Sequence, residues 1–88
     1  MSAFIFHTDP GHGWVEVPLP LVAELGITAD ISSYSYTDGR NAYLEEDCDA
    51  GLFIRAFEEV HGERPAFVER YADDTHVRKL PRFAGSAR

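Results

Sequence analysis

Residues 41–50 read NAYLEEDCDA and join a predicted β-hairpin to the most regularly patterned helix of the chain. Within this stretch, four carboxylates occupy five consecutive positions, at Glu45, Glu46, Asp47 and Asp49. Asp47 and Asp49 are suited to cap the free N–H groups at the start of the helix, where negative charge is also favoured. Capping does not explain Glu45 and Glu46, so the stretch predicts a binding surface as well as a helix start.

Two helices are predicted. The longer one follows the acidic stretch and ends at Gly62, and its apolar stripe should face the core. This stripe consists of Leu52, Phe53, Ala56, Phe57 and Val60. The shorter helix covers residues 20–25, with a proline in its first turn and Gly26 just beyond its end.

The predicted hairpin pairs residues 31–37 with residues 41–46 around Asp38-Gly39, a dipeptide that favours a tight type I′ turn. A two-residue loop would pair Tyr34 with Tyr43, and a four-residue loop would pair Tyr36 with Tyr43. In both cases Tyr34, Tyr36, Tyr43 and Glu45 share one face, which we expect to be the outer one. The opposite face is assigned to the core and holds Ile31, Ser33, Ser35, Ala42 and Leu44.

The rest of the chain completes a small α+β fold. Residues 4–7 and 14–17 predict a first hairpin with a wide Pro-Gly loop, residues 65–71 a strand, and residues 75–78 a final short strand. We therefore expect a small antiparallel sheet of four to six strands backed by the two helices. Residues 1–83 should form a single domain and residues 84–88 a flexible C-terminal tail.

Charge is distributed unevenly along the chain, whose net charge is −7. All 15 acidic residues lie between Asp9 and Asp74, where there are only four arginines and no lysine. Such an anionic body repels nucleic-acid phosphates and favours basic protein surfaces, so no direct nucleic-acid binding is expected. A single cysteine and a start that matches no signal peptide or membrane span predict a cytoplasmic protein without membrane contact.

Two groups of residues invite a chemical interpretation. His7, Asp9 and His12 are ligand types that zinc accepts, but their spacing matches no zinc motif, and His61 or His76 would have to complete the site. Cys48 lies at a helix start, where Asp47 and Asp49 oppose thiolate formation, so it is expected to be a small buried apolar residue. We therefore expect no metal, no cofactor, no catalytic residue and no enzymatic activity.

Three runs of the sequence carry a resemblance to known proteins: HGWVEVP at 12–18, ISSYSY at 31–36 and YLEEDCDA at 43–50. Together they resemble a set of short proteins encoded by bacteriophages and mobile elements. Small acidic phage-type proteins often block host defence, and anti-CRISPR proteins are similar to this chain in length, charge and lack of catalytic motifs. The resemblance implies a binding inhibitor and transfers no catalytic residue.

The expected function is inhibition of a nucleic-acid-handling complex, such as a CRISPR effector, by docking on its basic surface and excluding DNA or RNA. One alternative is a small metal-binding module or enzyme that uses His7, Asp9 and His12. A second alternative is a scaffold or homo-oligomeric protein without inhibitory role. The predicted partner-binding residues are Tyr34, Tyr36, Tyr43, Glu45, Glu46, Asp47, Asp49, Glu58 and Glu59.

Overall fold

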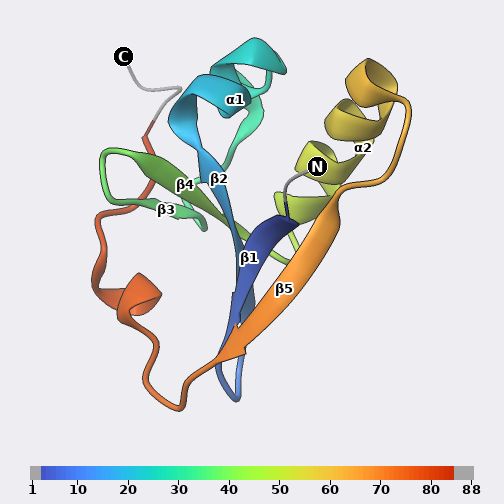
Figure 1. Ribbon diagram of the computed structural model, residues 1–88. Helices are drawn as coiled ribbons and strands as arrows, with labels where there is room; N and C mark the ends of the chain where they lie inside the picture. The colour runs from blue at the N-terminus through green and yellow to red at the C-terminus, as the bar shows by residue number, and fades with distance from the viewer. Residues whose placement is uncertain (1–2, 85–88) are drawn as a thin grey trace.

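The computed structural model describes residues 3–84 and confirms a small α+β domain (Figure 1). Of the expected tail at 84–88, only Ala84 belongs to the described residues. None of the helices within residues 3–84 has the length and apolar character needed to cross a bilayer. The elements are β1 (Ala3–Thr8), β2 (Gly13–Pro18), α1 (Leu19–Glu24), η1 (Thr28–Asp30), β3 (Tyr36–Thr37), β4 (Asn41–Glu45), α2 (Ala50–His61), β5 (Ala66–Tyr71) and η2 (His76–Lys79), where η marks a 3-10 helix.

The five strands form one sheet in the order β3-β4-β2-β1-β5. The β1–β2, β2–β4 and β3–β4 pairs are antiparallel, whereas β5 runs parallel to β1, with Phe4 opposite Phe67. The expected antiparallel arrangement is therefore wrong for this last pair. Because α2 carries the chain back along the sheet after β4, β5 starts at the same end as β4 and must run in its direction.

Both helices cover the same face of the sheet and share one apolar core with it. Phe53 and Phe57 of α2 are buried against Phe4 of β1, with ring centroids 5.1 and 5.6 Å away. Val60 was expected in the same stripe but is 58% exposed, because the last turn of α2 extends past the starts of β1 and β5 (Figure 1). The buried residues of this core are Val15, Val17, Val22, Ile27, Ile31, Ala42, Leu44, Ala50, Phe53, Phe57 and Phe83.

The opposite face of the sheet is also covered, by residues 72–84, which we call the C-terminal segment. Trp14, Tyr43 and Val77 form a second buried cluster there. The segment is fixed by backbone hydrogen bonds from Thr37 N–H to the Pro81 carbonyl and from Phe83 N–H to the Ser35 carbonyl. The prediction that Tyr43 lies on an outer face is therefore wrong, since this segment removes it from solvent.

Within the C-terminal segment, residues 76–79 form the 3-10 helix η2 rather than the expected strand. Thr75 precedes this helix as its N-cap, and its side chain accepts a hydrogen bond from the Val77 N–H. Figure 1 shows η2 on the side of the sheet away from α2. The two faces of the sheet are thus covered mainly by different parts of the chain, although Phe83, near the end of the C-terminal segment, belongs to the helix-side core.

The central hairpin is shorter than expected. Of residues 31–37, only Tyr36 and Thr37 pair with β4, and the Tyr36–Tyr43 pair confirms the register of the four-residue loop. The turn is not type I′, because Asp38 does not adopt the positive φ that this turn requires. Instead the Asp38 carboxylate accepts the N–H groups of Arg40 and Asn41. Residues 31–35 leave the sheet because Ser32 and Ser35 are hydrogen-bonded to a side chain at the start of α2, described below.

The orientation of α2 can be tested because Phe53 is buried and Val60 is exposed. Phe53→Ala should lower the free energy of unfolding by about 3–5 kcal/mol, because it leaves a cavity in the helix-side core. Val60→Ala should change it by no more than about 0.5 kcal/mol, as is usual for exposed positions. Urea denaturation of both variants measures the difference. Similar losses for the two variants would contradict the placement of α2.

Candidate functional site

Residues from four separate parts of the chain line a hollow of about 320 Å³ on the face that the C-terminal segment partly covers. We call it the Trp14 hollow. It combines three aromatic rings, an imidazole, a thiol, two carboxylates and two guanidinium groups. Its lining residues are His12, Trp14, Tyr34, Tyr36, Glu45, Asp47, Cys48, Arg78 and Arg82.

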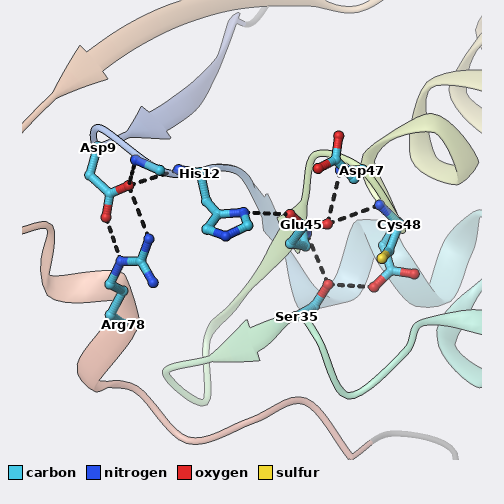
Figure 2. A network of polar contacts seen from close by, with 9 residues as sticks. Asp9, His12, Ser35, Glu45, Asp47, Cys48 and Arg78 are labelled. Atoms are coloured by element: carbon cyan, nitrogen blue, oxygen red, sulfur yellow. Dashed lines mark hydrogen bonds and ion pairs between the residues drawn. The ribbon is translucent and has the colours of Figure 1, made fainter.

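An ion pair between Asp9 and Arg78 closes one side of the site. Asp9 has a buried carboxylate that accepts hydrogen bonds from Arg78 Nε and Nη2 and from the N–H groups of Gly11 and His12 (Figure 2). The Arg78 bond and these backbone donors hold the pKa of Asp9 well below its ordinary value, although burial opposes them. The same guanidinium lies 5.0 Å from the centre of the Trp14 ring, a cation–π distance.

Glu45 organises the acidic turn before α2. Its Oε1 accepts hydrogen bonds from the N–H groups of Asp47 (2.9 Å) and Cys48 (3.0 Å), while Oε2 lies 3.2 Å from His12 Nδ1 (Figure 2). Its own N–H donates to Ser35 Oγ. The side chain is only 8% exposed. Glu45 thus fixes the turn with one carboxylate oxygen and faces His12 with the other.

Asp49 occupies the N-cap position of α2, yet its carboxylate makes no capping bond to the helix. It accepts hydrogen bonds from Ser32 N–H, Ser32 Oγ and Ser35 Oγ instead. The prediction that Asp47 or Asp49 caps the helix is therefore wrong. The carboxylate is buried against the 31–35 segment, where both serine hydroxyls donate to its Oδ2.

The predicted partner-binding residues do not form one surface. Tyr43, Glu45 and Asp49 are buried, and Tyr36 is half-buried. Tyr34, Glu46, Asp47, Glu58 and Glu59 are exposed, with Tyr34 at 63%. Tyr34, Tyr36, Glu45 and Asp47 meet in the Trp14 hollow, whereas Glu46 lines a separate apolar hollow beside α2, and Glu58 and Glu59 lie on α2 itself.

The residues of the alternative metal site are also separated. His7 Nε2 is 2.7 Å from Glu16 Oε1, and Asp9 is held by Arg78, so neither converges with His12. Among residues 3–84, only one group of three His, Cys, Asp or Glu side chains is close enough to share a metal ion: His12, Glu45 and Asp47, with ligand atoms within 4.8 Å of one another. Sequence spacing could not identify this group, because pairing of β2 with β4 brings together residues 33 positions apart.

Cys48 is exposed, so its assignment as a buried apolar residue is wrong. Desolvation, followed by the carboxylates of Glu45, Asp49 and Asp47, raises the pKa of its thiol. The raised pKa agrees with the expectation that the acidic neighbours of Cys48 disfavour its thiolate form. A protonated thiol is a weak nucleophile.

Sequence reasoning found Tyr34 and Tyr36 but missed Trp14, Arg78 and Arg82 of the hollow. Arg78 lies against Trp14, and Arg82 lies 5.3 Å from the centre of the Tyr36 ring while donating to the Ser33 carbonyl. The Trp14 indole N–H is buried and has no acceptor among the described residues. The only available signal was compositional, since a short basic end follows a long acidic body.

No protein-family model, curated protein or solved structure matches this chain. The candidate site is therefore identified from the side chains that line each hollow of the structure. Two larger hollows of about 440 Å³ are lined mainly by apolar and uncharged residues. The Trp14 hollow differs from both because titratable and aromatic side chains converge in it.

The Asp9 carboxylate predicts a specific dependence of stability on pH. Its folded-state pKa lies below its unfolded-state value of about 3.9, so ionised Asp9 stabilises the fold above that pH and the contribution is lost as the pH falls further. Asp9→Asn should cost about 1–3 kcal/mol at pH 7, because Arg78 and its charge-assisted bonds lose their partner.

This cost should shrink steadily between pH 5 and the lowest pH at which the protein folds, as protonation removes the advantage of the parent. Urea denaturation of both proteins across that range measures it. A cost that stays constant with pH would show that the ion pair contributes only through shape and neutral hydrogen bonds.

Proposed function

We propose that this protein is a non-catalytic binding protein that docks on a basic surface of a nucleic-acid-handling complex and blocks access of nucleic acid. The observation that carries this proposal is the exposure of its carboxylates. Of the 15 acidic side chains, 11 are exposed: Glu24, Asp30, Asp38, Glu46, Asp47, Glu58, Glu59, Glu63, Glu69, Asp73 and Asp74. Such a surface attracts cationic partners and speeds their association.

The Trp14 hollow is the proposed centre of the contact. Tyr34 offers a largely exposed ring, and Tyr36 a partly exposed one, on the concave surface that Asp47 also lines. Tyrosine gives a large, rigid contact area with a polar end, and it is enriched among residues that dominate binding energy. Asp47 forms no ion pair within the described part of the chain, so its charge is available to a lysine or arginine of the partner.

The remaining side-chain chemistry supports binding over catalysis. His7 is buried, Asp9 is held by Arg78, and the pKa of the Cys48 thiol is raised, so His7 is not accessible to a substrate and neither Asp9 nor Cys48 is poised as a base or nucleophile. The resemblance to short phage-encoded proteins narrows the proposal to an anti-CRISPR or other anti-defence inhibitor acting in the cytoplasm. A CRISPR effector subunit is the partner that we propose on that basis.

Substitutions of exposed residues in the Trp14 hollow should weaken partner binding without destabilising the fold. Tyr34→Ala should weaken the complex by about 1–2 kcal/mol at any salt concentration, because it removes contact area. Asp47→Lys should slow association at low salt, and this defect should diminish as salt is raised and screens the charges of parent and partner. Surface-based kinetics against the partner, captured from host lysate at low salt and then purified, would measure both effects.

Glu24→Lys is the matched control for charge. It makes the same change at an exposed position in α1, at the opposite end of β2 from Trp14, and should leave the association rate close to that of the parent. The purified partner should also lose its DNA or RNA when the protein is added in excess. Retention of nucleic acid under saturation, or parental kinetics for Tyr34→Ala and Asp47→Lys, would count against the proposal.

A further inference from the structure

We propose that His12, Glu45 and Asp47 form a binding site for a zinc ion, which shares only His12 with the alternative set of His7, Asp9 and His12. The group supplies one imidazole nitrogen and two carboxylate oxygens, all within 4.8 Å of one another. These are ligand types that zinc accepts, and three protein ligands leave a fourth position for water. The two carboxylates balance the charge of a divalent ion.

The separation between His12 and Glu45 fits a shared ion. Tetrahedral zinc with ligands at about 2.0–2.1 Å places neighbouring ligand atoms about 3.3–3.4 Å apart. His12 Nδ1 and Glu45 Oε2 are 3.2 Å apart, close to that edge. The second His–Glu pair of the protein, His7 with Glu16, is 2.7 Å apart, as expected for a direct charge-assisted hydrogen bond.

The surroundings of Glu45 resemble those of a metal ligand. Its Oε1 is held by two backbone N–H groups, which fixes the carboxylate and directs Oε2 toward His12. Its side chain is 8% exposed, whereas that of His12 is 47% exposed, so an ion could enter from the solvent side. Trp14 also lines this hollow, and its indole N–H is buried and has no acceptor among the described residues.

Zinc titration of the untagged protein, by calorimetry and by elemental analysis after dialysis, tests the site directly. We expect about one zinc ion per chain and a higher melting temperature in zinc than in chelator. His12→Gln and Asp47→Asn should each weaken zinc binding at least tenfold. Both side chains are exposed, so circular dichroism without zinc should show that the variants fold like the parent.

Two matched controls define specificity. His76→Gln removes an exposed histidine outside the group, and Glu46→Gln removes an exposed carboxylate of the same turn; both should bind zinc like the parent. Cys48→Ser should also keep full affinity, since the thiol is not a member of the group. Absence of stoichiometric zinc in the parent, parental affinity in His12→Gln and Asp47→Asn, or loss of zinc in Cys48→Ser would overturn the proposal.

The zinc measurement uses the protein alone and does not depend on the proposed function. Tyr34→Ala leaves all three proposed ligands in place, so it should lose partner affinity while it retains zinc. Parental partner binding by Tyr34→Ala would count against the proposed contact surface, whereas loss of zinc in that variant would overturn the assignment of zinc binding to His12, Glu45 and Asp47.

Discussion

The ion pair between Asp9 and Arg78 joins the loop after β1 to the C-terminal segment, across 69 residues of sequence. Its carboxylate is buried and also accepts two backbone N–H groups, so loss of the guanidinium would leave a charge poorly solvated. Arg78 in turn lies against Trp14. The pair therefore fixes both the C-terminal segment and one side of the Trp14 hollow. Without it, the Trp14–Tyr43–Val77 cluster would lose part of its cover.

The acidic stretch that dominates the sequence serves several separate purposes in the fold. Asp49 is buried with Ser32 and Ser35, and Glu45 holds the backbone of the turn, so these two carboxylates are structural. Glu46 and Asp47 are exposed and lie on different sides of the turn, since they line different hollows. Of the four carboxylates in this run, two thus stabilise the fold from buried positions and two are charges on the surface. Local repulsion is limited because hydrogen-bond donors compensate the buried carboxylates.

The sequence was sufficient for features that depend on local periodicity. Short-range patterns were enough to predict the α+β class and the core position of Ala42 and Leu44. They also predicted the end of α2 at Gly62, which has a positive φ. The burial of Tyr43 could not be predicted in this way, because its cover comes from residues more than 30 positions later. The parallel β1–β5 pair was missed for a related reason, since direction is decided by the crossover through α2. The meeting of His12 with Glu45 depends on the β2–β4 register, which strand propensity alone does not specify.

Glu45 contributes both to the fold and to the proposed site, through different carboxylate oxygens. Glu45 uses Oε1 for the turn and presents Oε2 to His12, so replacing it would disturb the fold and the site together. His12, Tyr34 and Asp47 have exposed side chains at the same hollow, and none of them contributes to either buried cluster. Glu45 and Trp14 are buried beside these exposed groups, and the partly exposed Arg78 lies against Trp14. Groups that are held in place before association lower the entropic cost of binding, so the buried side chains around the hollow would favour the binding that we propose.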